Sequence, residues 1–408
     1  MRTTSAYVLR HASAYLVRRA SAYVTLWFVV LASTLSAQQR DSLADTTRRP
    51  FVRGGVYDKP FQTRLLGRTA IGGYAEAHAR WQEVEGLKDD AGFEAKRFNL
   101  FTHTRVSDFV RIGAELEFED AGSEIKLEYA AIDLLFSPSL ALRGGMILSP
   151  LGKFNLAHDS PLNEFTDRPL VSTELIGVAL SEPGFGLLGQ RAIRGTQRIT
   201  YELYATNGFH SGLIDDSEAG TRVALGRGNF EDNNGSPAFV GRTAWSPNVN
   251  HEIGVSAHHG AYNVFNLEGT RVDERRDLTI AVIDAETRLL GTTVSGEAAL
   301  VRVDVPPGLV GIYASNQHGW YVEAVRDIGL GLVRAMPASS FALKARWDYV
   351  KFDADISGES AAQVTVGANF RPTRDSALKF DYVRGRGRDR FNNRAEHAFI
   401  LASLATYF

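Results

Sequence analysis

The feature that most constrains the fold is a two-residue alternation of apolar and polar side chains, which recurs from Ala70 to the C-terminus. In Phe341–Tyr349 every second residue is apolar, and the positions between them include Lys, Arg and Asp. Ile71–Trp81 and Val110–Glu119 repeat the pattern. Because successive side chains of a β-strand point to opposite faces, this period predicts strands with one apolar and one charged face.

Three features favour a membrane barrel over a soluble sandwich. The polar faces carry full charges along many strands, which suits a water-filled interior better than a dry core. The segments are about ten residues or longer, the length that a tilted membrane strand needs. Aromatic residues such as Trp245, Trp320 and Trp347 lie near strand ends on the apolar phase, as in the interfacial girdles of barrels.

We therefore predict an all-β fold, a transmembrane antiparallel β-barrel of about 16 strands. Longer polar loops follow the odd-numbered strands and short turns follow the even-numbered ones, so both termini should lie in the periplasm. The predicted strands are residues 70–82, 94–107, 109–120, 124–136, 139–149, 186–195, 197–207, 237–246, 251–262, 277–290, 292–304, 318–327, 340–353, 361–371, 376–385 and 395–408.

The N-terminus has the pattern of an export signal. Several Arg residues precede an apolar stretch, Tyr23–Leu35, and Ser36-Ala37 supplies small residues for cleavage. We expect a signal peptide at 1–37, a periplasmic tail at 38–69 and the barrel at 70–408. An uncleaved membrane anchor is the alternative for 1–37, although the apolar stretch is short for a span.

Composition excludes several chemistries. The 408 residues include no Cys, which removes thiol nucleophiles, Cys-ligated metals and disulfides. The formal net charge of −2 gives no electrostatic case for a nucleic-acid partner. No cofactor or metal site is predicted. The enzyme alternative is a membrane-embedded hydrolase, but the chain has no GxSxG motif, and His397 and Ser403 fall on the inward phase of the last strand.

Two resemblances sharpen the interpretation. The terminal Phe408 closes an alternating strand and resembles the C-terminal signal of outer-membrane barrel proteins. The stretch from Glu115 to Gly189 resembles the phosphate- and polyphosphate-selective porin family (porin O/P). One piece differs: before Ser-Glu-Pro-Gly the family commonly has Pro-Thr-Thr-Trp-like residues, whereas this chain has Gly177-Val178-Ala179-Leu180. The matching pieces are Gly144-Gly145-Met146, Pro150-Leu151-Gly152, Phe154-Asn155, Asp167-Arg168-Pro169 and Ser181-Glu182-Pro183-Gly184.

The resemblance implies two strands, a periplasmic turn and a long loop that folds into the channel, here 150–186. It also implies a homotrimer, and small outward residues on the first strand (Gly73, Ala75, Ala77 and Ala79) would let barrels pack closely. Phosphate-selective members guide anions along a ladder of lysines to an arginine constriction. This chain has only 8 Lys and no strand with Lys at alternating positions, so phosphate specificity is not carried over.

Candidate channel-lining residues follow from the polar phase and the inserted loop. Their charges nearly cancel. One hypothesis is a transverse field between basic and acidic walls at the narrowest point, where Arg side chains would steer anions. The other is that the charges form ion pairs between neighbouring strands and have only this structural role in a wall that contacts water. The candidates are Arg97, Arg105, Arg111 and Arg143, then Glu115, Glu117 and Glu119, and in the loop Lys153, His158, Glu164, Asp167 and Arg168.

The sequence thus predicts an outer-membrane porin for passive diffusion of small hydrophilic or ionic solutes, with anions such as phosphate among the candidates. The alternative is a non-conducting barrel that serves as an adhesin or structural anchor. A soluble periplasmic β-protein fits the charged strand faces less well. Expected partners are outer-membrane lipid and lipopolysaccharide, whose phosphates the basic segment at 385–390 could contact.

Overall fold

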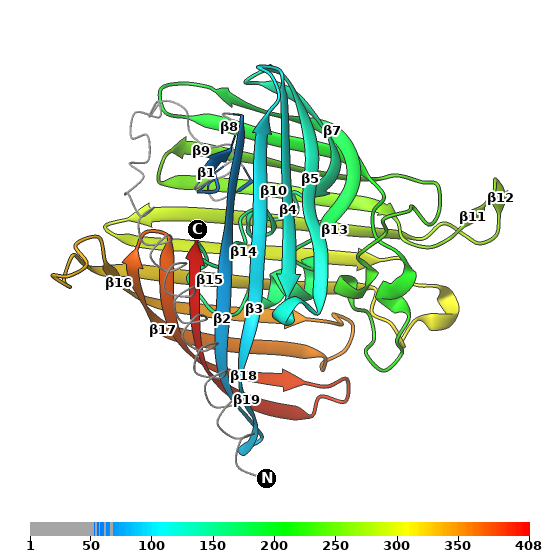
Figure 1. Cartoon of the computed structure of the whole chain (residues 1–408). Helices are drawn as coiled ribbons and strands as arrows, with labels where there is room; N and C mark the ends of the chain where they lie inside the picture. The colour runs from blue at the N-terminus through cyan, green and yellow to red at the C-terminus, as the bar shows by residue number, and fades with distance from the viewer. Residues whose placement is uncertain (1–52, 54, 57, 61–62, 66–67) are drawn as a thin grey trace, which may run out of the picture. The chain divides into compact units, whose positions relative to one another are not determined.

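The computed structural model describes residues 53, 55–56, 58–60, 63–65 and 68–408. The predicted signal peptide at 1–37 and most of the predicted tail lie outside these residues. The described chain forms a closed barrel of sixteen long antiparallel strands (Figure 1), as predicted. Each strand pairs with its chain neighbours, and the last pairs with the first from His397↔Val84 to Tyr407↔Tyr74, which closes the ring.

The strands alternate with two-residue to 32-residue connections, and the bounds are as follows. The barrel strands are β2 (Thr69–Val84), β3 (Leu87–Arg105), β4 (Val110–Glu119), β5 (Glu124–Ser137), β6 (Leu140–Leu148), β7 (Ser181–Ala192), β8 (Arg198–Thr206), β9 (Ala238–Asn248), β10 (His251–Ala261), β13 (Asp277–Leu289), β14 (Thr292–Val303), β15 (Asn316–Leu330), β16 (Ser340–Lys351), β17 (Ser360–Thr373), β18 (Ser376–Arg388) and β19 (Arg394–Tyr407).

The remaining elements are short. Strand β1 (Thr63–Leu65) pairs with β2, and β11 (Asn266–Leu267) with β12 (Thr270–Arg271). Within the described residues, no helix is long and apolar enough to cross a bilayer. The helical turns are η1 (Asp120–Gly122), α2 (Lys153–Leu156), the π-turn η2 (Ser172–Ile176), η3 (Ser211–Ile214), η4 (Val223–Gly226) and η5 (Pro307–Leu309).

Two strands begin well before the position that the sequence predicts. Strand β3 begins at Leu87 because Glu85 and Gly86, both with positive φ, form a tight hairpin that extends β2 and β3 beyond their neighbours. Strand β7 begins at Ser181, so the Ser-Glu-Pro-Gly piece is paired to β6. Its proline lies near the strand start, where the missing N–H is tolerated. The inserted loop is therefore 149–180.

Side-chain burial is inverted relative to a soluble protein. Along β16 the side chains of Lys344, Arg346 and Asp348 are buried inside the ring, while Trp347 is 53% exposed on the outside. Outward aromatics form pairs at both ends of the strands, for example Trp320 with Trp347 and Phe98 with Phe408. A continuous apolar exterior of this kind requires a lipid environment.

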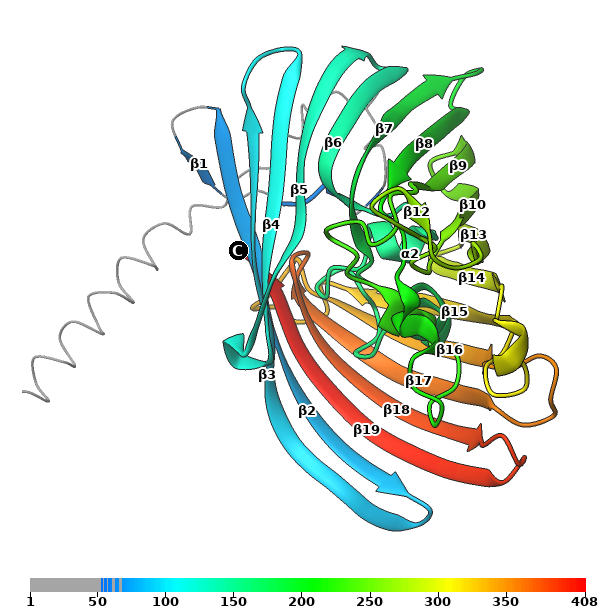
Figure 2. The same ribbon diagram turned by 90° about the vertical axis from the view of Figure 1, so that its right-hand side faces the viewer.

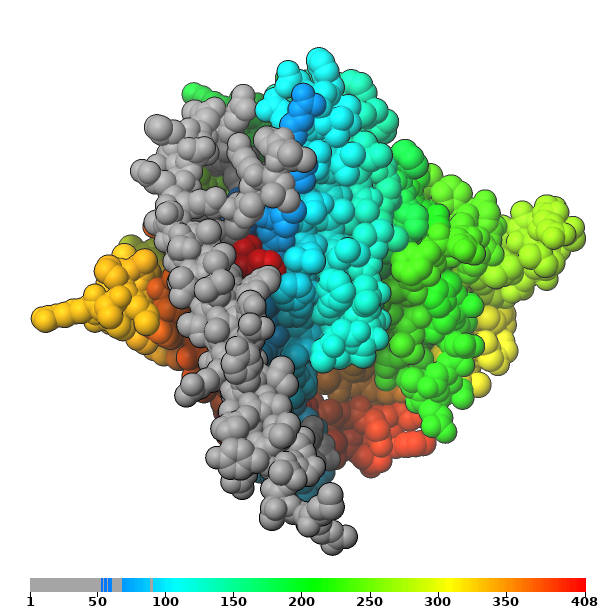
Figure 3. Space-filling view, in the orientation of Figure 1, coloured from blue at the N-terminus to red at the C-terminus, as the bar shows by residue number. Residues whose placement is uncertain are grey.

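The connections differ between the two ends of the barrel. The turns after β3, β5, β7, β9, β13 and β17 are short, and this is the turn end; the other end, with the longer connections, is the loop end. In Figure 3 the β11–β12 hairpin and the turn between β15 and β16 project on opposite sides. Figure 2 shows that the connection from β6 to β7, which contains α2, folds into the ring.

The lipid-facing assignment predicts a depth-dependent cost for a charge on the outer surface. Leu404 is 53% exposed on β19, between the outward aromatic pairs. Leu404→Arg should destabilise the barrel by about 2–4 kcal/mol, because the guanidinium would lie near the bilayer midplane. Urea unfolding in lipid vesicles measures the change. Phe391→Arg in the β18–β19 loop is the control and should leave stability unchanged; equal effects would refute the assignment.

Candidate channel constriction

The inward face of the wall is a network of ion pairs between strands. Arg143 of β6 makes a bidentate pair with Asp133 of β5, with N–O distances of 2.8 and 2.9 Å. Arg242 of β9 pairs with Asp284 of β13 across Gly254 of β10. A Cβ on Gly254 would lie 2.4 Å from the guanidinium, so glycine is what allows this pair. These buried charges are therefore satisfied within the wall.

The four predicted arginines do not form one cluster. Arg97 of β3 bonds Glu76 and contacts Glu117 and Glu119 at 3.2 and 2.9 Å. Arg143 belongs to the β5–β6 pair described above. The other two are opposite each other at the turn end, in the register Arg105↔Arg111. Arg105 is 61% exposed there and pairs with Asp108 of the turn.

The three predicted glutamates of β4 have two different environments. Glu115 accepts hydrogen bonds from Asn99, at 3.0 Å, and from Lys59. Glu117 and Glu119 instead share Arg97. Glu119 also contacts Lys126 at 3.0 Å and is only partly buried. The acidic strand therefore presents Glu117 and Glu119 toward the loop end.

The inserted loop is fixed to the opposite wall by charges that the sequence assigns to the lumen. Lys344 donates to the carbonyl of Glu164 and Lys379 to that of Ser160, at 2.5 and 2.8 Å. Wall carboxylates accept backbone N–H groups of the loop in return, with Asp381 bonding Thr166 at 2.8 Å. The loop thus spans the lumen, from its roots on β6 and β7 to contacts on β16–β19.

The predicted loop residues occupy separate positions along this path. Lys153 pairs with Glu286 at 3.1 Å and His158 contacts Glu128 at 3.0 Å. Burial, together with the nearby Arg168 cation, lowers the pKa of His158 to about 4, so the ring is neutral at pH 7. Glu164 pairs with Arg371, and Asp167 with Arg80 of β2, each at 3.1 Å.

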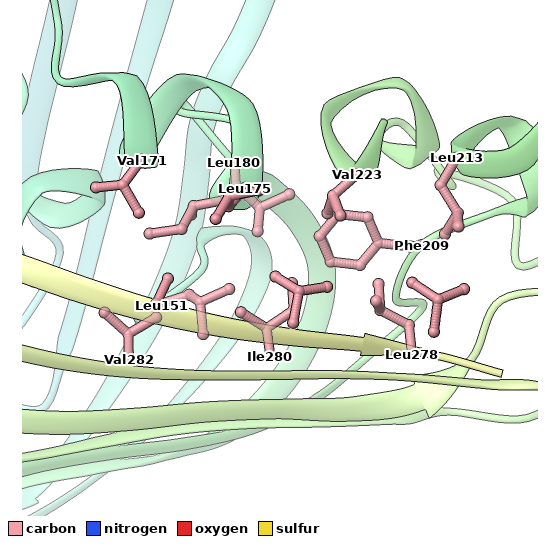
Figure 4. Close-up of a cluster of buried hydrophobic side chains, with 14 of the residues drawn as sticks. Leu151, Val171, Leu175, Leu180, Phe209, Leu213, Val223, Leu278, Ile280 and Val282 are labelled. Carbon is pink, nitrogen blue, oxygen red and sulfur yellow. The ribbon is translucent and has the colours of Figure 1, made fainter. Parts of the chain in front are cut away.

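An apolar core lies inside the ring, which the sequence pattern did not lead us to expect (Figure 4). Leu151 and Leu175 of the inserted loop, together with Phe209 of the β8–β9 loop, pack on the inward face of β13. That face is apolar at Leu278, Ile280 and Val282. Part of the lumen is therefore filled by folded loops.

Two loop arginines face the acidic strand. Arg168 donates to the carbonyl of Val178 at 3.4 Å, and Arg227 of the β8–β9 loop donates to the adjacent carbonyl of Gly177 at 2.8 Å. Burial and the neighbouring Arg168 lower the pKa of Arg227, while Glu119 and Glu117 oppose this effect. Arg227 was not among the predicted residues; the apolar Phe209, Leu213 and Val223 in a supposedly polar loop were the signal that this loop folds inward.

Comparisons with known proteins agree on the fold. No protein-family model matches the chain. An uncharacterized protein of Aquifex aeolicus (strain VF5) is 23% identical over 361 residues, which cover 81% of this chain and 79% of that protein. Among solved structures, the anion-selective porin from Comamonas acidovorans aligns with a TM-score of 0.55 at 11% identity, covering 83% of this chain and 99% of that one.

Two further structures are similar to the chain. The outer membrane channel DcaP of Acinetobacter baumannii aligns with a TM-score of 0.55 at 12% identity, over 86% of this chain and 100% of that one. OmpT of Vibrio cholerae in its trimer form aligns with a TM-score of 0.51 at 11% identity, over 84% and 100%. The fold is thus the porin-type barrel, whereas the porin O/P family itself does not follow from these likenesses.

The wall network makes a prediction about stability. Asp133 is fully buried and Arg143 is 5% exposed, so Asp133→Asn leaves a guanidinium without its bidentate partner. We expect a loss of about 3 kcal/mol in the free energy of unfolding, measured by urea titration in vesicles. Asp108→Asn, which breaks the exposed pair with Arg105, should leave stability unchanged. Equal losses for the two variants would contradict a buried network.

Proposed function

We propose that the protein is an outer-membrane porin that lets small hydrophilic and ionic solutes diffuse passively. The observation that carries the proposal is a closed barrel with an apolar exterior, a charged interior and a loop that spans the lumen. A pore of about 16 strands is wide enough for an aqueous channel, and an inserted loop narrows it to the size of small solutes. The loop end would face the outside of the cell.

The selectivity would arise from a transverse field at the loop. Arg168 and Arg227 lie on the loop side, and Glu117 and Glu119 lie on the β4 side. A dissolved ion that passes between them would lose water and interact with both walls. Removal of charge from one wall alone should therefore alter the ion preference of the pore. This arrangement has the opposed basic and acidic walls that the sequence suggested. Its basic wall consists of the predicted Arg168 and the unpredicted Arg227, and not of Arg97, Arg105, Arg111 and Arg143.

A preference for phosphate has no support in the lumen. Five lysines inside the ring are engaged with protein groups: Lys59 and Lys153 bind carboxylates, and Lys344, Lys351 and Lys379 bind carboxylates or loop carbonyls. They do not form a ladder that would pass an anion along the pore. We propose a general ion and solute pore, for which added phosphate should produce no specific block.

We also propose a homotrimer. The small outward side chains of β2, such as Ala75, Ala77 and Ala79, would allow close packing of barrels, and the similar OmpT of Vibrio cholerae is described in a trimer form. Chemical crosslinking of the folded protein tests the assembly.

The second candidate, a non-conducting anchor or adhesin, is favoured by one observation. The apolar core around Leu175, Phe209 and Ile280 fills part of the lumen in a way that a wide diffusion pore does not need. The two functions differ in whether a folded barrel passes current.

The transverse field predicts opposite effects of two double variants. Arg168→Ala with Arg227→Ala should shift the reversal potential in a KCl gradient toward cation preference. Glu117→Gln with Glu119→Gln should shift it toward anions. Arg105→Ala, which removes an exposed turn arginine, is the control and should leave the reversal potential unchanged. Unchanged potentials in both double variants would place the field elsewhere.

The inserted loop predicts a change in pore size. Deletion of 153–168 removes the segment that crosses from β6 to β16–β19 and should raise the single-channel conductance severalfold, because the lumen becomes wider. Heat-modifiable gel mobility verifies that the shortened barrel is folded. A folded barrel whose conductance equals that of the wild type would place the loop outside the conducting path.

A further inference from the structure

The chain before the barrel enters the lumen at the turn end. Arg53 contacts Glu286 of β13 at 3.5 Å, and Lys59 contacts Glu115 of β4. Strands β13 and β4 lie on nearly opposite sides of the ring. Val56 packs against the cluster that contains Leu148 and Leu156 at the root of the inserted loop. Residues 53, 55–56 and 58–60 therefore reach from the β13 side of the lumen to the β4 side.

Lys59 ends this segment in an enclosed pocket. Its side chain is 4% exposed, and its ammonium bonds the carboxylates of Glu115 and of Asp159, the latter at 3.0 Å. The nitrogen also lies 5.0 Å from the centre of the Phe101 ring, a cation–π distance. Burial alone would lower the pKa of Lys59, but the Asp159 and Glu115 carboxylates outweigh it and raise the pKa above its ordinary value, so the group is charged.

The pocket is built by the barrel and the loop independently of Lys59. Asn99 orients Glu115 through a 3.0 Å hydrogen bond, and the Tyr407 hydroxyl donates to Asp159 at 2.9 Å. The rings of Tyr74 and Phe101 contact that of Tyr407 at 6.0 and 6.3 Å. Two carboxylates within an aromatic box are the groups that recognise an organic ammonium ion.

The pocket also contains hydrogen-bonding atoms that Lys59 does not contact. The Tyr74 hydroxyl and the Asn99 side-chain oxygen belong to fully buried residues, and neither atom has a hydrogen-bond partner among the described residues. Tyr74 and Asn99 are paired across β2 and β3, and Asn99 also bonds the Glu115 carboxylate. Buried polar atoms without partners are uncommon, and here they line a site for a cation with several N–H donors.

We propose that this pocket is a binding site for primary alkylammonium ions, occupied internally by Lys59, and that residues 53, 55–56 and 58–60 thereby close the turn end of the lumen as a tethered ligand. A free alkylammonium ion would compete with Lys59 for Glu115, Asp159 and the aromatic walls. The part concerning closure rests on the proposed channel function, whereas binding does not. A divalent metal is a poorer fit, because such ions require six or more oxygen ligands or several imidazoles.

The first test is chemical rescue. Lys59→Ala should lower the unfolding temperature of the detergent-solubilised barrel, and n-butylammonium chloride should raise it again by several degrees, because ligand binding to the folded state is stabilising. Tetraethylammonium chloride at equal concentration has no N–H donor and should have no such effect. In Lys59→Met the side chain fills the pocket, so the rescue should be smaller. Lys88→Ala, an exposed lysine on the β2–β3 hairpin, is the matched control and should not respond.

Equal responses of Lys59→Ala and Lys88→Ala to butylammonium, or no response in either, would overturn the proposal. Should Lys59→Ala fail to fold alone, refolding with and without butylammonium replaces the melting curve. A recovered yield of heat-modifiable barrel would support the pocket, and an unchanged yield would overturn it.

Conductance separates this inference from the proposed function. Lys59→Ala should conduct more than the wild type, and butylammonium should reduce its current toward the wild-type level. A variant that binds butylammonium but passes no current would contradict the proposed channel function and would still support the binding pocket. A variant that conducts without any effect of butylammonium on current or stability would overturn the pocket and leave the channel.

Discussion

The structure depends on one constraint, namely that backbone polar groups facing hydrocarbon have no water with which to bond. Each of the sixteen strands therefore pairs on both sides, and the ladder between β19 and β2 removes the last free edge. The closed ring forces alternate side chains outward and inward. Apolar groups such as Leu404 then face lipid, and charges such as Asp348 face the interior.

The inward charges have a second role, because several of them hold the chain segments that fold into the ring. Lys344, Lys379 and Asp381 bind the backbone of the inserted loop rather than a solute. The loop is thus positioned by the wall, and its own Arg168 is brought opposite the acidic strand β4. Structural pairing is compatible with the proposed constriction: the paired charges fix the loop, and the loop places Arg168 where the proposal needs it.

The strands could be predicted because their signal is local, and the inserted loop was predicted from the resemblance of Glu115–Gly189 to the porin O/P family. Alternation in Val110–Glu119 and Phe341–Tyr349 identifies strands without knowledge of their partners. The partners themselves could not be predicted, because they depend on closure and register. The pair of Arg242 with Asp284 crosses an intervening strand and requires Gly254. Arg227 lies near Arg168 because Phe209 and Leu213 fold inward onto β13, whose inward face is apolar at Leu278, Ile280 and Val282.

The measurement that tests the central claim most directly is single-channel recording of the folded wild-type barrel in a planar bilayer, beside the barrel that lacks 153–168. A water-filled channel narrowed by its loop predicts discrete current steps from both proteins. Silence from both, with folding verified by heat-modifiable mobility, would contradict a diffusion pore and would identify the barrel as an anchor.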